Sequence, residues 1–148
     1  MGKRGFTLIE LLIVVAIIGM LAAIAIPYLF RSLNRARQKR SMADMRTLAA
    51  AIEQYGLDMT FYPLVTDIDH LALVLEPTYL RKIPRNDGWN RPFLYQVDLD
   101  AGKDYTLASL GMDGVRGTWV IGRRTTRYDD DIVISDGQFV QWPEGMQK

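Results

Sequence analysis

Residues 6–26, FTLIELLIVVAIIGMLAAIAI, form an apolar run that contains one charged side chain, Glu10. As an α-helix, these 21 residues span about 31 Å, which matches the hydrocarbon core of a bilayer. An acidic side chain at the centre of such a helix costs about 2.5–3.5 kcal/mol on insertion scales. The sequence therefore predicts a membrane helix that meets copies of itself, so that Glu10 finds a partner.

The remainder of the chain has the composition of an ordinary soluble domain. The 148 residues suffice for one domain, and the net charge is +1. A nearly neutral charge argues against nucleic acid as a partner. Cysteine is absent, which excludes disulfides, thiol catalysis and Cys-ligated zinc. The stability of this domain must therefore come from packing or from a bound ion.

A short basic stub, MGKRG, precedes the apolar run. It does not form a secretory signal peptide with the run, because no A-x-A-like cleavage site follows the apolar residues. Lys3 and Arg4 favour a cytoplasmic N-terminus. Basic residues after the run oppose that orientation: Arg31, Arg35, Arg37, Lys39 and Arg40. This basic section either contacts anionic lipid headgroups or forms a solvated helix face, and charge alone leaves the topology open.

The segment KRGFTLIELLIVVAIIGMLAAIAIP closely resembles the processing and assembly segment of type IV pilins and type II secretion pseudopilins. The resemblance implies that a prepilin peptidase cleaves after Gly5 and methylates the new N-terminal residue, Phe6. It also implies that Glu10 neutralises the α-amine of a neighbouring subunit, and that Pro27 is the family's helix-interrupting proline. Helical geometry agrees, since Glu10 lies four residues after Phe6 and therefore on the same face.

Beyond Pro27 the helical pattern resumes as one apolar stripe. Its members recur at steps of three and four residues: Met42, Met45, Leu48, Ala49, Ile52 and Tyr55. The pattern predicts one helix over residues 6–55, with Gly56 as its C-cap. The first half would lie in the membrane or the filament core, and the second half would pack on a small domain.

The C-terminal part predicts a small sheet. Residues 56–91 read as a loop-rich connector with a short apolar helix around Leu71, Leu73, Val74 and Leu75, ended by Pro77. Strands are expected at 92–97 and 105–110, and a hairpin at 132–142 turns at Asp136–Gly137. Three or four antiparallel strands against the helix give a pilin-like α+β fold. The predicted parts are a leader (1–5), a transmembrane and assembly helix (6–27), an amphipathic helix (28–56) and a globular domain (57–148).

A second, looser resemblance covers most of the remaining chain. The segments FYP (61–63), YLRKIP (79–84), DGWNRPFLY (87–95), YTLASLGMDGVRG (105–117) and DDDI (129–132) resemble the major pseudopilins of type II secretion systems. The chain departs from that pattern at one turn. Asn90 replaces the usual Gly after Trp89, and an extra Gly88 precedes it.

In that branch the loop after the S-x-G-x-D-G strand binds calcium, and the resemblance implies the same here. The expected ligands are the carbonyl of Leu110 and the side chains of Asp113, Asp129, Asp130 and Asp131. Calcium takes six to eight oxygen ligands, so this composition is suitable. However, the segment WVIGRRTTRY (119–128) does not fit the branch. Arg123, Arg124 and Arg127 could instead neutralise the aspartates, and both interpretations stay open.

No catalytic set is recognisable. His70 is the only histidine, and beside Asp67 and Asp69 it is read as a surface or capping residue. No serine-hydrolase, zinc-protease or phosphate-loop motif occurs. The chain is therefore expected not to be an enzyme.

The resemblance implies a major structural subunit of a pseudopilus, a helical homopolymer that drives export of folded proteins across the outer membrane. It further implies a single-pass protein of the bacterial inner membrane with its C-terminal domain in the periplasm. The implied partners are other copies, minor pseudopilins, the prepilin peptidase and the inner-membrane assembly platform. The alternatives are a type IV pilus subunit for adhesion, motility or DNA uptake, and a minor tip subunit that binds a ligand.

Overall fold

The computed structural model describes residues 5–147, which fall into two compact units with the boundary between Leu33 and Asn34. One helix, α1 (Leu8–Met59), contributes residues to both units. The second unit also contains α2 (Ile68–Leu75) and five strands. The strands are β1 (Leu94–Val97), β2 (Tyr105–Ser109), β3 (Arg123–Thr125), β4 (Ile132–Ser135) and β5 (Gln138–Pro143). The half of the helix expected at residues 28–56 thus belongs largely with the C-terminal domain.

The first unit is an apolar helix segment without a protein core of its own. Its large apolar side chains from Leu8 to Ile26 are 46–83% exposed. This part of α1 is the one stretch, among the described residues, that is long and apolar enough to cross a membrane. The helix continues through Gly19 and Pro27 without a break in its assignment. Pro27 therefore does not end the helix.

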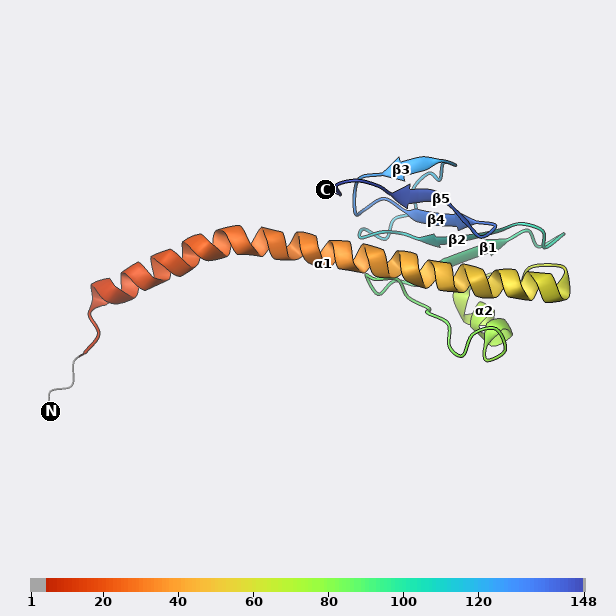
Figure 1. Cartoon of the computed structure of the whole chain (residues 1–148), viewed down its shortest axis with the longest axis horizontal. Helices are drawn as coiled ribbons and strands as arrows, with labels where there is room; N and C mark the ends of the chain where they lie inside the picture. The colour runs from red at the N-terminus through yellow and green to blue at the C-terminus, as the bar shows by residue number, and fades with distance from the viewer. Residues whose placement is uncertain (1–4, 148) are drawn as a thin grey trace. The chain divides into compact units, whose positions relative to one another are not determined.

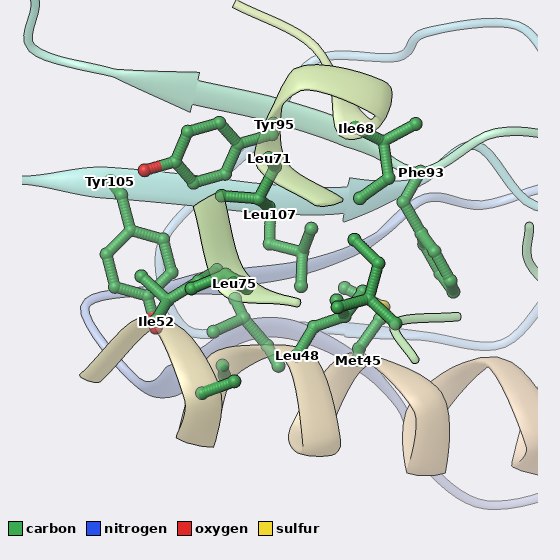
Figure 2. Close-up of a cluster of buried hydrophobic side chains, with 14 of the residues drawn as sticks. Met45, Leu48, Ile52, Ile68, Leu71, Leu75, Phe93, Tyr95, Tyr105 and Leu107 are labelled. Carbon is green, nitrogen blue, oxygen red and sulfur yellow. The ribbon is translucent and has the colours of Figure 1, made fainter. Parts of the chain in front are cut away.

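The predicted apolar stripe on α1 is confirmed in the second unit. Met45, Leu48 and Ile52 are fully buried, and Met42 and Tyr55 pack at the margin of the same core. Figure 2 shows Met45, Leu48 and Ile52 of α1 facing side chains from α2 and from the strands. The sheet and α2 therefore close over one face of α1, as a helix with a 3.6-residue apolar period requires.

The predicted end of α1 is wrong. Gly56 lies inside the helix, which continues to Met59, and Thr60 ends it with a positive φ of 67°. A Cβ at Gly56 would lie 2.7 Å from the Tyr62 ring. Gly56 therefore serves a close approach between the helix and the following loop, and not a cap.

The short helix α2 is confirmed with sharper bounds. Asp67 caps its N-terminus by accepting hydrogen bonds from the amides of Asp69 and His70. Its buried face consists of Ile68, Leu71, Ala72 and Leu75. Leu73, which belongs to the apolar part of the predicted helix, is 77% exposed. α2 covers the core beside α1 (Figure 1).

The sheet has the strand order β1-β2-β4-β5-β3. The β4–β5 hairpin is confirmed, and Asp136 and Gly137 both have positive φ, 47° and 77°, as a type I′ turn requires. The predicted α+β fold, a long helix packed on a small and mainly antiparallel sheet, is confirmed, but the sheet has five strands and not three or four. The additional strand, β3, pairs parallel to β5 and lies within the segment 119–128, for which no strand was predicted.

The turn at residues 87–91 explains both departures from the branch pattern. Asn90 adopts φ 65°, the left-handed conformation that Gly usually provides. Gly88 is needed for a different reason, because a Cβ there would collide with the backbone carbonyl of Arg37 on α1. The Gly88 amide also donates to Ser41 Oγ at 2.9 Å. The turn is therefore fastened directly onto the helix.

The buried carboxylate of Asp87 holds this turn to the sheet. Asp87 is 2% exposed, and its Oδ1 accepts the amides of Trp89 and Arg91, each at 2.9 Å. Its Oδ2 accepts the hydroxyl of Ser109, at the end of β2, at 2.7 Å. The side chain of Asp87 thus joins the segment DGWNRPFLY (87–95) to the segment YTLASLG (105–111).

Gly88→Ala is expected to destabilise the domain by about 1–3 kcal/mol, because the added methyl group meets backbone on α1 that cannot rotate away. Gly117→Ala is the matched control, since its Cβ would meet Asp131 Oδ2 at an ordinary 3.6 Å. Urea unfolding of the full chain in detergent micelles, followed by near-ultraviolet circular dichroism, measures both. Equal midpoints for the two variants would contradict the close approach.

Tyrosines beside Glu53 should make the domain sensitive to alkaline pH. The pKa of Tyr62 is raised to about 12, mainly by burial and secondly by the Glu53 carboxylate, which accepts a hydrogen bond from the Tyr62 hydroxyl. An unfolded tyrosine titrates near pH 10. The unfolded chain therefore loses this proton first, and stability should fall as pH rises from 10 towards 12. Tyr62→Phe should weaken the dependence of stability on pH above 10. Tyr28→Phe, at an exposed site, should leave it unchanged. Thermal unfolding of both variants at several pH values is the measurement.

Candidate functional site

The expected cleavage point is open to an enzyme. Gly5 and Phe6 lie outside any helix, α1 begins at Leu8, and the Phe6 side chain is 76% exposed. A Cβ added at Gly5 would meet nothing within 4 Å. The rest of the expected leader, residues 1–4, lies outside the described residues. The peptide bond between Gly5 and Phe6 is therefore sterically accessible.

Thr7 and Glu10 form a reciprocal cap at the start of α1. The Thr7 amide and hydroxyl donate to Glu10 Oε2 at 2.9 and 2.7 Å, and the Glu10 amide donates to Thr7 Oγ1 at 3.3 Å. This is a capping box, which satisfies amide groups that a helix start leaves without partners. Thr7 was not predicted as part of the site, although the spacing of Thr and Glu in TLIE is typical of a capping box.

The cap leaves part of the Glu10 carboxylate available. Both Thr7 bonds end on Oε2, and Glu10 is exposed in the described chain. A cationic group from outside, such as the α-amine of another copy, can therefore approach Oε1. Glu10 is suited to two tasks, ordering the first helical turn and pairing with a charge in a neighbouring chain.

The five expected calcium ligands lie along the connection between β2 and β4, and one oxygen of each accepts a hydrogen bond from another group of that connection. The Leu110 carbonyl accepts the Gly114 amide, and Asp113 Oδ1 accepts the Val115 amide at 2.9 Å. Asp130 Oδ2 accepts the Arg127 amide at 3.2 Å. These are turn contacts within a few residues of chain, and they do not gather the oxygens around one point.

Asp129 and Asp131 are engaged more strongly. Asp129 Oδ2 pairs with the Arg127 guanidinium at 2.9 Å, as the arginine interpretation expected of Arg127, whereas Arg124 pairs with Glu144 and not with these aspartates. Asp131 is 2% exposed, and its Oδ2 accepts the Gly117 amide at 2.9 Å and the Trp119 indole N–H at 2.6 Å. Its Oδ1 is buried without a hydrogen-bond partner among the described residues.

The buried Oδ1 of Asp131 is one candidate ligand and does not make a calcium site by itself. Calcium requires six to eight oxygens, and no three acidic, histidine or cysteine side chains of residues 5–147 lie together as metal ligands would. As folded, these residues do not fit the ion. Calcium binding stays a prediction from the resemblance. The proposed function does not depend on it.

His70 has a structural role. Its Nδ1 lies 2.6 Å from Asp67 Oδ2 at the exposed N-terminus of α2. The ring thus contributes to the cap of that helix, in agreement with the surface or capping role expected for it.

Comparisons with known proteins cover both units. Residues 28–123 match the family described as type II secretion system (T2SS), protein G, and residues 1–26 match the prokaryotic N-terminal methylation motif. The chain is 37% identical over 127 residues to the type II secretion system core protein G of Pseudomonas aeruginosa, covering 78% of this chain and 87% of that protein. It is 34% identical over 129 residues to the Vibrio cholerae core protein G, with the same coverages. For the Escherichia coli K12 core protein G, the identity is 32% over 128 residues, 78% of this chain and 86% of that protein.

These matches agree with the geometry. The methylation motif covers the exposed Gly5–Phe6 bond and the Thr7–Glu10 cap, and the protein G match covers the second half of α1, α2 and the first strands. The motifs of the second unit join one segment of the fold to another and assemble no reactive group. The chain belongs to the type II secretion system protein G family, the major pseudopilins, which are structural proteins and not enzymes.

Proposed function

We propose that this pseudopilin is cleaved after Gly5, methylated on Phe6, and polymerised through α1 into a periplasmic pseudopilus that drives export of folded proteins across the outer membrane. The observation that carries the proposal is the apolar half of α1 with its single carboxylate. Its large side chains from Leu8 to Ile26 contact no protein core, and the methylation motif covers the same residues.

The environment of such a helix supports assembly between copies. Before assembly the apolar surface is covered by lipid, and in a filament it is covered by the same helix of other subunits. In both settings water is excluded, so the pairing of Glu10 with a neighbour's amine is stronger than it would be in water. A register that pairs these charges is favoured over registers that leave Glu10 alone.

The proposed location follows from the same helix. The chain is a single-pass protein of the bacterial inner membrane, its C-terminal domain lies in the periplasm, and the assembled form is a filament of the cell envelope. The proposed partners are other copies of the chain, minor pseudopilins, the prepilin peptidase and the inner-membrane assembly platform. Neither a nucleic acid nor a metal is needed for these contacts.

Processing is tested by mass spectrometry of the chain isolated from membranes of a host that carries prepilin peptidase. The expected product begins at Phe6 and carries one methyl group on its α-amine. Gly5→Leu should remain uncleaved, because the peptidase would meet a side chain at its cleavage point, whereas the fold has open space there. An unmethylated full-length wild-type chain in the same host would contradict the proposal.

Assembly is tested in a secretion host that lacks its own major pseudopilin. Glu10→Gln retains a residue that suits a capping box but removes the charge, so this variant should be processed and yet form few or no filaments. Thr7→Ala removes the cap and keeps the charge, and it should assemble better than Glu10→Gln. Electron microscopy of sheared filaments and the amount of exoprotein released are the measurements.

The results of these two experiments distinguish a major pseudopilin from a type IV pilus subunit and from a minor tip subunit. Wild-type assembly by Glu10→Gln would exclude charge pairing as the cause of the helix register. Filaments without restored exoprotein release would favour a type IV pilus subunit. A wild-type chain that is processed but scarce in every filament would favour a minor tip subunit.

A further inference from the structure

The connection between β2 and β4, residues 110–131, is closed at its base by backbone contacts. The Met112 amide donates to the Tyr128 carbonyl at 2.8 Å. Gly111 has φ 64°, and a Cβ there would lie 2.6 Å from the Asp129 carbonyl oxygen. The two ends of the connection are therefore held together by backbone contacts alone.

The buried Asp131 carboxylate then holds the middle of the connection. Oδ2 receives two N–H groups, from the Gly117 backbone and the Trp119 indole, at 2.9 and 2.6 Å. Hydrogen bonds to an ionised acceptor are short and are stronger than neutral ones. Gln141 on β5 adds a second anchor, because its Nε2 donates to the Asp131 carbonyl and its Oε1 accepts the Val120 amide.

Arginine side chains complete the closure on the outside. The Arg116 guanidinium lies 4.2 Å from the centre of the Trp119 ring, and its Nη2 donates to Gln96 Oε1 on β1 at 3.2 Å. Arg124 on β3 pairs with Glu144 at 2.7 Å, just beyond β5. Figure 1 shows β3 beside β5, so the far end of the connection is paired into the sheet.

We propose that this chain closes its β2–β4 connection by a protein-only clasp, in which the Trp119 indole and the Gly117 amide both donate to Oδ2 of Asp131, and that the loop is ordered without calcium. The clasp consists of Gly117, Trp119, Asp131 and Gln141. It takes the place of the ion implied by the resemblance. The proposal is independent of filament assembly, because every contact lies within the second unit.

Hydrogen–deuterium exchange of the full chain in detergent micelles tests the clasp, with saturating calcium or with a chelator. Peptides that contain the Gly117 and Val120 amides report directly on the bonds to Asp131 and Gln141. In the wild type, exchange in the two conditions should agree within about twofold. Trp119→Phe keeps the ring over Arg116 but removes the indole donor, and these peptides should exchange roughly tenfold faster in both conditions.

Two further variants keep the test decisive. Trp89→Phe is the matched control, because the Trp89 indole N–H is buried without a hydrogen-bond partner among the described residues, and its loss should leave the exchange of residues 114–122 unchanged. Asp113→Ala alters an exposed residue outside the clasp. In this variant, as in the wild type, exchange with calcium and exchange with the chelator should agree. Global unfolding midpoints of all variants identify any that fail to fold.

A chelator that speeds exchange in the wild type overturns the proposal, whether or not Trp119→Phe also has an effect. Loss of that chelator effect in Asp113→Ala would then assign the loop to calcium. Unchanged exchange in Trp119→Phe, in a folded variant, also overturns the proposal. Chelator-independent exchange together with acceleration by Trp119→Phe supports it.

Discussion

The burial of one stripe of α1 is the interaction on which the rest of the structure depends. Met45, Leu48 and Ile52 are fully buried, and α2 and the sheet present their apolar faces to them. A small domain without disulfides has few other sources of stability, so removal of this stripe would leave the sheet with one uncovered face. The same helix carries exposed apolar residues in its first part. A single element therefore carries two kinds of surface, one buried in a protein core and one exposed and apolar enough to cross a membrane.

Motifs that characterise a family are often taken as chemical sites, but here they join segments of backbone. Asp87 connects its turn to Ser109 on β2, and Gly88 permits that turn to touch α1. Tyr62 of the FYP segment packs edge-on against Tyr105, with ring centres 4.7 Å apart. These contacts are long-range in sequence and short in space. They explain why a structural subunit can carry specific motifs without any catalytic residue.

Features that depend on local sequence were predictable, and features that depend on distant contacts were not. The apolar stripe, the helix near Leu71 and the Asp136–Gly137 turn follow from periodicity and turn chemistry. Gly56 was misread because its reason for being Gly is the Tyr62 ring, which no helical pattern reveals. β3 was missed because three residues with two arginines lack a strand pattern, and their pairing with β5 is non-local. The clasp was missed because Trp119 and Asp131 are twelve residues apart, with no spacing rule that links them.

The short strand β3 has a consequence for the proposed assembly of many copies of the chain. It covers the free edge of β5, and Arg123 and Arg124, both exposed, stand on the outermost strand. An uncovered sheet edge is a template for pairing with the edge of another chain, and short charged edge strands discourage this. Membrane helices that gather subunits at high local concentration would raise that hazard. Arg123 and the Arg124–Glu144 ion pair place charged groups on this short edge strand, so domains can crowd together without joining into aggregated sheets.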